Sequence, residues 1–208
     1  MARVFLDGPG KRALGEAITG IEGVSSVEVV VSIRQQSGTY LHADLIAAGL
    51  TGVATLAFLL YSPWDFSYLA FLVDPVVLGG LVGWLVARTP RVRRLLSSRR
   101  LRAGQVTTGA HATFHEKEVG LTRRRTGLLV YVSLLERELR VLPDRAISEA
   151  VDATTWRTHV DALAGVVARG ASAAVLATEL RRLAGPLAQV LPRSPDDVNE
   201  LPDGVDGV

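Results

Sequence analysis

The chain of 208 residues contains no cysteine. This absence excludes disulfides, thiolate zinc sites and a cysteine nucleophile. It fits a reducing compartment without requiring one. The formal net charge is only +2, and the basic and acidic residues gather in separate local runs. We therefore expect no nucleic acid among the partners.

The sequence also lacks the common catalytic motifs. It has no glycine-rich phosphate loop followed by Lys-Ser or Lys-Thr, no His-Glu-x-x-His and no Gly-x-Ser-x-Gly. His111 and His115 have the i, i+4 spacing that can bind a metal, with Glu116 and Glu118 nearby. A third ligand at a suitable spacing is missing, so a solvated helix face explains the pair better. Ser133 has no evident His and Asp partners.

A signal peptide is not apparent at the start of the sequence. The first ten residues, MARVFLDGPG, carry Asp7 and two glycines where an apolar segment should be. We expect this start to be mature, cytosolic sequence.

What the sequence does have is a concentrated excess of apolar residues. Hydrophobic residues make up 48% of the chain and the mean hydropathy is +0.26. Residues 45–61 carry no charge, and residues 69–87 carry one, Asp74. A helix that crosses a hydrocarbon core of about 30 Å needs about 20 residues, with about 17 as the lower limit. The two runs predict two transmembrane helices.

The connection between these runs, residues 62–68, is too short to form a domain. We therefore predict an antiparallel hairpin. Trp64 and Tyr68 stand where an interfacial aromatic belt is expected. The alternative, a buried hairpin inside a soluble protein, is disfavoured because the rest of the chain is too small to cover it.

Two features within the hairpin have a structural interpretation. Small residues four apart in each run let helix backbones approach closely in lipid. Asp74 precedes Pro75, and this pair suits a helix N-cap followed by the first helical residue. The alternative is that Asp74 is a functional acid, since acids inside membrane spans often are. The small residues are Ala48, Gly52, Gly79 and Gly83.

The second run is followed by a basic segment, residues 88–102, with seven arginines and no acid. Positive charge close to a span stays cytoplasmic. We therefore expect an integral protein of the cell (inner) membrane with both termini cytoplasmic. The same segment is expected to lie on the lipid bilayer and to contact anionic headgroups. The arginines are Arg88, Arg91, Arg93, Arg94, Arg99, Arg100 and Arg102.

The two arms outside the hairpin are incomplete on their own. Residues 10–21 predict a short helix and residues 24–34 an alternating strand. An arm of about 44 residues is below what folds without help. In the second arm, residues 103–121 predict a helix, residues 126–133 a central strand that is apolar on both faces, and residues 138–142 a strand nearer an edge. Helices are predicted at 144–153, 155–169 and 173–190.

Because each arm needs strands from the other, we predict one split cytoplasmic domain made of residues 1–44 and 103–192. The hairpin (45–87) and the basic segment (88–102) are then insertions, and residues 193–208 form an irregular acidic tail. The first two strands should be parallel with a right-handed crossover. The expected fold class is α/β, a small mixed sheet flanked by helices and interrupted by a two-helix transmembrane hairpin.

Acidic residues provide a further candidate site for a metal cofactor. Asp144 directly follows the third strand, and a group of acids and amides lies in the tail. If the tail folds back over the strand ends, hard oxygen ligands could hold Ca²⁺ or Mg²⁺. The alternative, favoured on composition, is a solvated tail that pairs with the arginines. The tail group is Asp196, Asp197, Asn199, Glu200 and Asp203.

Several of these segments resemble the TPM-domain family. They are residues 125–137 (RTGLLVYVSLLER), residues 139–145 (LRVLPDR), the helix containing Trp156, and residues 196–203 (DDVNELPD). The whole is similar to the bacterial membrane branch, in which a transmembrane hairpin interrupts the domain. The first arm departs from the family pattern, because GVSSVE (residues 23–28) replaces the usual Thr-Ser-Gly-Glu.

The resemblance implies an α/β sandwich and several possible roles. Some plant relatives are described as acid phosphatases, some relatives bind calcium, and others are auxiliary subunits or repair factors of membrane complexes. If a metal site carries over, the matching positions are Asp144, Asn199 and Asp203.

Two hypotheses follow. The first is a non-catalytic, membrane-anchored module that binds a membrane-associated protein or supports membrane maintenance. The second is a metal-dependent phosphatase with Asp144, Asn199 and Asp203 as ligands. The first is favoured, because acids without a nucleophile, a base or a phosphate cradle make a poor enzyme.

Overall fold

The computed structural model describes residues 5, 7–196, 198–201 and 205–207. The chain forms two compact units. One comprises Met1–Ser37 together with Ala103–Val208, and the other comprises Gly38–Arg102. We call them the α/β unit and the hairpin unit and describe each by itself.

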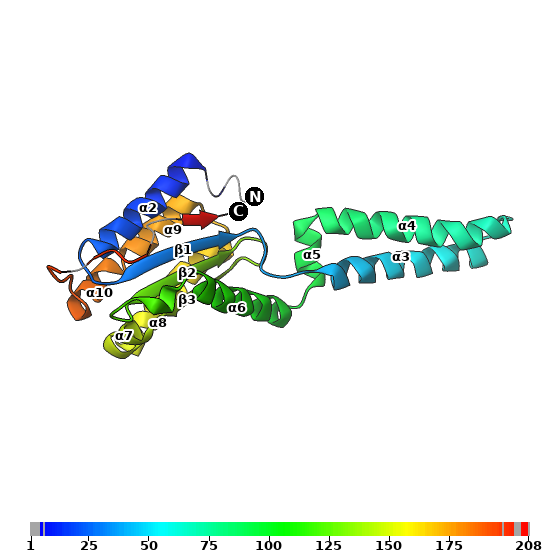
Figure 1. The fold of residues 1–208 in the computed structure, drawn as a ribbon. Helices are drawn as coiled ribbons and strands as arrows, with labels where there is room; N and C mark the ends of the chain where they lie inside the picture. Colours follow the sequence, from blue (N-terminus) through cyan, green and yellow to red (C-terminus); the bar gives the residue numbers. More distant parts are fainter. Residues whose placement is uncertain (1–4, 6, 197, 202–204, 208) are drawn as a thin grey trace. The chain divides into compact units, whose positions relative to one another are not determined.

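A mixed sheet of four strands lies at the centre of the α/β unit (Figure 1). Its order is β3-β2-β1-β4, with β1 parallel to both β2 and β4, and β3 antiparallel to β2. The predicted α/β class and the parallel pairing of the first two strands are therefore confirmed, although 92 residues separate Arg34 from Gly127. The strands are β1 (Glu28–Arg34), β2 (Gly127–Ser133), β3 (Glu138–Pro143) and β4 (Val205–Gly207).

Helices cover both faces of this sheet. The larger hydrophobic core joins one face to α2 and α9 and includes side chains of α8 and α10. A smaller cluster joins the other face to α6, through Val30 and Leu129 on the strands and Val106 and Ala110 on the helix. The helices are α2 (Gly8–Glu22), α6 (Arg99–Glu116), the 3₁₀ turn η1 (Val119–Leu121), α7 (Arg145–Ala150), α8 (Ala153–Arg169), α9 (Ala173–Arg181) and α10 (Ala184–Val190).

Two predictions for the C-terminal region are wrong. The single helix expected at 173–190 is divided into α9 and α10. Pro186 cannot donate a helical hydrogen bond to the carbonyl of Arg182 and its ring crowds that carbonyl, so the helix breaks there. The tail is also not wholly irregular, because Val205–Gly207 forms β4 against Val31–Ile33.

The hairpin unit consists of α3 (Leu41–Tyr61), α4 (Tyr68–Arg88) and the short α5 (Pro90–Leu96). Both long helices have 21 residues, and their best windows have a mean hydropathy of 1.9 and 2.1. Only 17% of each window is buried within the protein. By length and composition, both helices could cross a membrane. α3 begins four residues before the first predicted run, and α4 extends the second by one residue at each end.

Small residues allow the backbones of α3 and α4 to pack closely. A Cβ atom on Gly79 would lie 2.7 Å from the carbonyl oxygen of Ala48, and one on Gly52 would lie 3.2 Å from that of Pro75. Only glycine permits such contacts between helix backbones without displacement. The small residues singled out in the sequence therefore lie in the helix interface.

Asp74 is not an N-cap, so its predicted role is wrong. α4 begins at Tyr68, and Ser67 caps it by accepting a hydrogen bond from the amide of Leu69 at 3.3 Å. Pro75 lies inside the helix. The helix therefore starts at the Ser67 cap and continues through the Asp74-Pro75 pair.

Candidate functional site

A buried polar cluster lies at the end of the parallel strands, where the chain leaves β1 for the hairpin unit. The Ser37 hydroxyl lies 2.7 Å from the Ser133 hydroxyl, to which it donates, and 3.0 Å from the Tyr131 hydroxyl. Ser133 in turn donates to the Glu136 carboxylate. The other oxygen of Glu136 accepts the Ser37 amide at 3.0 Å. We call Ser37, Tyr131, Ser133 and Glu136 the junction cluster.

Backbone pairing places these side chains together. The amides of Leu134 and Leu135 donate to the carbonyls of Arg34 and Gln35 at 3.0 and 2.9 Å, which continues the β1–β2 pairing beyond the strand ends. The turn then reverses into β3 through Arg137, whose φ is 54°. The connection after β1 and the turn after β2 are therefore joined side by side.

Three of the four residues of the junction cluster are buried, and Ser37 is half-buried. Tyr131 is 2% exposed, Ser133 is 0% and Glu136 is 4%. α6 covers it, because a Cβ atom on Gly109 would lie 2.6 Å from the Tyr131 oxygen. A buried carboxylate needs hydrogen-bond donors, and Ser37 and Ser133 supply them. Since no solute reaches the Ser133 oxygen, the arrangement suits a structural clamp better than a nucleophile.

Sequence reasoning found Ser133 but not its partners. Ser37 and Glu136 lie 96 and 3 residues away from it. The signal that could have found Ser37 is the parallel register, which pairs Arg34 with Ser133 and brings the residues after each strand together.

Asp144, the first predicted metal ligand, lies at the opposite end of the strands from the junction cluster. Its amide donates to the carbonyl of Gly127 at the start of β2. Its Oδ1 atom accepts from the Arg145 amide at 2.8 Å and caps α7. Its Oδ2 atom is buried without a hydrogen bond, and Arg125 Nη1 lies 3.8 Å away. This oxygen is therefore an unsatisfied acceptor near a cation.

The tail contacts the chain at this same end of the strands. The Glu200 carboxylate accepts the Arg123 amide at 2.9 Å, and the Leu201 amide donates to Glu28 at 3.3 Å. Asn199 is exposed, and it is not without an interaction partner. Asp203 lies outside the described residues. Among the residues that are described, no group of three or more His, Asp or Glu side chains could hold a metal, so the Ca²⁺ or Mg²⁺ site stays a prediction.

A cavity of about 340 Å³ is lined by Pro143 and by residues of α7 and α8. Its lining is mostly apolar and includes Ile147, Val151, Trp156 and Val160, with Arg157 as the only charged residue. Such a lining suits an apolar side chain better than a phosphate ester.

The hairpin unit uses several of the predicted headgroup-binding arginines internally. Arg93 donates to both oxygens of Asp44, at 3.0 and 2.5 Å, and this hydrogen bonding raises the pKa of Arg93. Arg102 donates to the carbonyls of Arg94 and Ser97. Arg88 stacks over the Trp84 ring at 4.1 Å.

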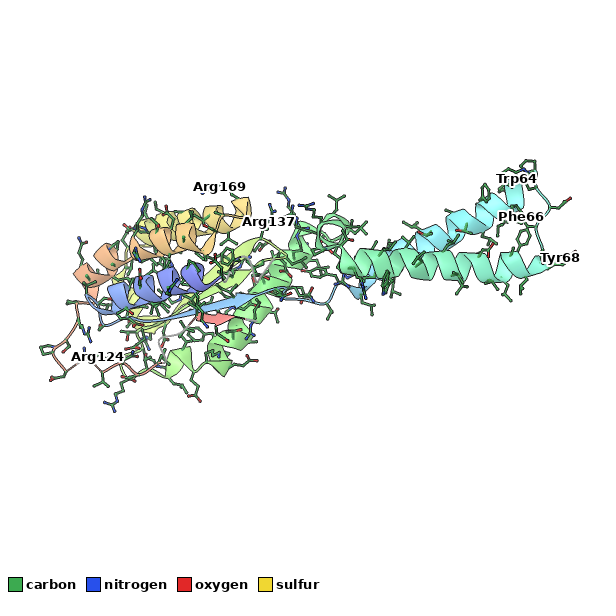
Figure 2. The ribbon with its side chains drawn as sticks, turned by 90° about the horizontal axis from the view of Figure 1, so that it is seen from above. Trp64, Phe66, Tyr68, Arg124, Arg137 and Arg169 are labelled. Atoms are coloured by element: carbon green, nitrogen blue, oxygen red, sulfur yellow. The ribbon has the colours of Figure 1, made fainter. Side chains whose placement is uncertain are left out.

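The tip of the hairpin is aromatic. Trp64 and Phe66 lie in the connection between α3 and α4, with ring centroids 6.5 Å apart (Figure 2). Phe58 contacts both rings at 6.2 and 6.1 Å. Tyr68 is 96% exposed. This composition is typical of a membrane–water interface.

These features define the class: an α/β protein of TPM-like fold that carries a hairpin of two long apolar helices. Among solved structures, the chain is similar to the BA42 protein of the psychrophilic bacterium Bizionia argentinensis, determined by NMR. The TM-score is 0.60 and the identity 17%, over 98% of this chain and 96% of that chain. At this identity the likeness shows the fold alone. No protein-family model and no curated protein matches the sequence.

Proposed function

We propose that the protein is a membrane-anchored TPM-like module that binds a membrane-associated partner protein and carries out no catalysis itself. The observation that carries the proposal is the hairpin unit. Two helices of 21 residues expose most of their apolar surface, and they are inserted between Ser37 and Ala103 of the α/β unit. Such a surface is stable in lipid and a liability in water.

The flanking charges support an orientation with both termini cytoplasmic. The aromatic tip and the arginine-rich segment stand at opposite ends of the hairpin helices, as interfacial and cytoplasmic signals do. Exposed arginines of that segment, Arg91, Arg99 and Arg100, are the ones proposed to meet anionic headgroups.

The junction cluster supports a binding role over a catalytic one. Its Ser133 hydroxyl donates to the Glu136 carboxylate, yet Ser133 is 0% and Glu136 4% exposed. The cluster holds the connection to the hairpin against the sheet, which suits a module whose position at the membrane matters.

The absence of cysteine allows a clean test of topology. Single variants Asp65→Cys, in the hairpin connection, and Thr158→Cys, on the exposed face of α8, are expressed in cells and treated with a membrane-impermeant maleimide. Asp65→Cys should label from outside the membrane, and Thr158→Cys only after lysis. The unmodified chain is the control, since it cannot be labelled. Release of the chain by carbonate, or equal labelling of both variants in intact cells, would contradict the proposal.

A metal-dependent phosphatase is the second candidate, favoured by the unsatisfied Oδ2 atom of Asp144. With Asn199 and Asp203, this oxygen would hold Ca²⁺ or Mg²⁺. The test is turnover of a generic phosphomonoester by the purified full chain with and without each ion. Metal-dependent turnover that is lost in Asp144→Asn and Asp203→Ala would establish this function in place of the first.

A further inference from the structure

Asp74 is an acid inside a long apolar helix. It follows Tyr68, the first residue of α4, by six positions, which is about 9 Å along the axis at 1.5 Å per residue. Its side chain is half-buried. It makes no hydrogen bond or ion pair with any residue that the structure describes.

This inference rests on the proposed function, in which α4 spans the membrane. The depth of Asp74 along α4 then decides what surrounds its carboxylate. Tyr68 stands at the aromatic tip, so a carboxylate about 9 Å further along the helix lies within the hydrocarbon. Long basic side chains can reach back to the interface from such a depth, but the short side chain of aspartate cannot. An unpaired acid there is costly, and such residues mark binding or transport sites.

A second acceptor lies within one turn of Asp74. Pro75 has no N–H, so it cannot donate the helical hydrogen bond that the Phe71 carbonyl would otherwise accept. The helix therefore presents a carboxylate and an underused carbonyl at nearly the same depth. Both require a donor, and an ammonium or guanidinium group offers several.

The hairpin has no cationic donor of its own. Residues 45–87 include no Lys, Arg or His. The hydroxyls of Thr51 and Thr55 on α3 already donate to carbonyls of their own helix, at 2.8 and 2.9 Å. A second copy of the chain would bring the same carboxylate to the same depth, and like charges repel.

We propose that Asp74 is the docking point for a transmembrane helix of another protein that carries a Lys or Arg side chain at matching depth. The pair forms in lipid, where few other groups compete for the carboxylate. Charge complementarity selects this partner over a second copy, and the apolar remainder of α4 provides the packing surface around the pair.

The test uses the full chain in vesicles of phosphatidylcholine and phosphatidylglycerol. A fluorophore attached at Asp65→Cys serves as the donor in energy-transfer measurements of association. The probe is a Leu/Ala transmembrane peptide with one Lys about six residues from the tip-side end, and the matched peptide has Leu instead. The Lys peptide should associate about five-fold more tightly, as expected for one interhelical polar contact of about 1 kcal/mol. The difference should persist in Asp74→Glu and vanish in Asp74→Leu.

Matched variants and a second measurement distinguish a partner helix with a Lys or Arg side chain from a second copy of the chain. Leu72→Ala changes a span residue that is 71% exposed and should leave the preference for Lys unchanged. Equal association of the two peptides, or a preference that survives Asp74→Leu, overturns the inference. Energy transfer between two labelled copies that is lost in Asp74→Leu overturns it in favour of self-association. A chain that carbonate extracts from the vesicles overturns the proposed function as well, whereas an inserted chain without preference overturns only this inference.

Discussion

The Ser37 hydroxyl donates to the Ser133 hydroxyl across 2.7 Å, although the two residues are 96 positions apart in the sequence. Ser37 is the last residue of the α/β unit before the hairpin unit, and Ser133 is the last residue of the central strand. The hydrogen bond therefore links the connection after β1 to the end of β2. Glu136 adds two more hydrogen bonds at this point, because it accepts from both serines.

Removal of the Glu136 carboxylate should destabilise the α/β unit. Glu136→Ala leaves the buried Ser133 hydroxyl and the amide of the half-buried Ser37 without their acceptor. The buried hydroxyl alone should cost about 1–3 kcal/mol. Urea unfolding of the full chain in detergent, followed by tryptophan fluorescence, measures the loss. Glu149→Ala is the control, since Glu149 is exposed and pairs with the exposed Arg145, and it should change stability by less than about 0.5 kcal/mol. Equal effects of the two variants would refute the clamp.

Gly127 is required at the start of β2. A Cβ atom there would collide with the backbone carbonyl of Val119 and lie 2.8 Å from its Cγ1 atom. Backbone cannot yield as a flexible side chain does, so Gly127→Ala should cost about 1–3 kcal/mol. Gly104→Ala is the matched control on α6, because nothing lies within 4 Å of its Cβ position. Helix propensity predicts that this control gains up to about 1 kcal/mol, and thermal unfolding of the two variants should therefore shift in opposite directions.

Asp152 should make the start of α8 sensitive to acid. Its carboxylate accepts from the amides of Thr155 and Thr154 at 2.8 and 3.0 Å. Hydrogen bonding from Thr155 lowers the pKa of Asp152. A lowered pKa in the folded state means that the cap is fully formed above the ordinary carboxyl value of about 4 and is lost as the pH falls through the lower folded value.

The measurement is amide hydrogen exchange at Thr154 and Thr155 as the pH is lowered, corrected for intrinsic rates. Protection should fall in the unmodified chain. It should stay constant in Asp152→Asn, because the asparagine oxygen caps a helix and does not titrate. Protection with the same pH profile in both proteins would show that another group controls this end of α8.

Hydrophobic patterning was sufficient to predict three of the four strands of the sheet. The β-branched alternation of residues 24–34 and the apolar run at 126–133 each required a neighbouring strand, and only the other arm could supply it. Periodicity is a property of every residue in a segment, so it survives errors at single positions. The parallel pairing of β1 with β2 follows from that requirement.

The polar contacts could not be predicted in the same way. The bond between Ser37 and Glu136 depends on the conformation of the connection after β1, which no periodic pattern encodes. Asp74 was misassigned because the local Asp-Pro rule was applied without the Ser67 cap seven residues earlier. β4 was missed because three residues with a single apolar side chain, Val205, give too short a signal.

The two arms should fold only together. β1 is an inner strand that pairs with β2 and with β4, so a fragment of residues 103–208 would leave one side of β2 without its partner. It would also lack α2, whose Leu14 and Ile18 are fully buried in the larger core. We expect this fragment to show neither cooperative unfolding nor dispersed amide resonances.

The matched protein restores the first arm without the hairpin. Residues 38–102 are replaced by a flexible linker of about ten Gly and Ser residues, long enough to span about 17 Å. Ser37 and Gly109 are close in the α/β unit, since a Cβ atom on Gly109 would lie 3.5 Å from the Ser37 Cβ, and only six helical residues separate Gly109 from Ala103. This protein should therefore fold, unfold cooperatively and stay soluble without detergent. If the isolated 103–208 fragment folds equally well, the first arm is an accessory to the domain and β1 does not hold the sheet together.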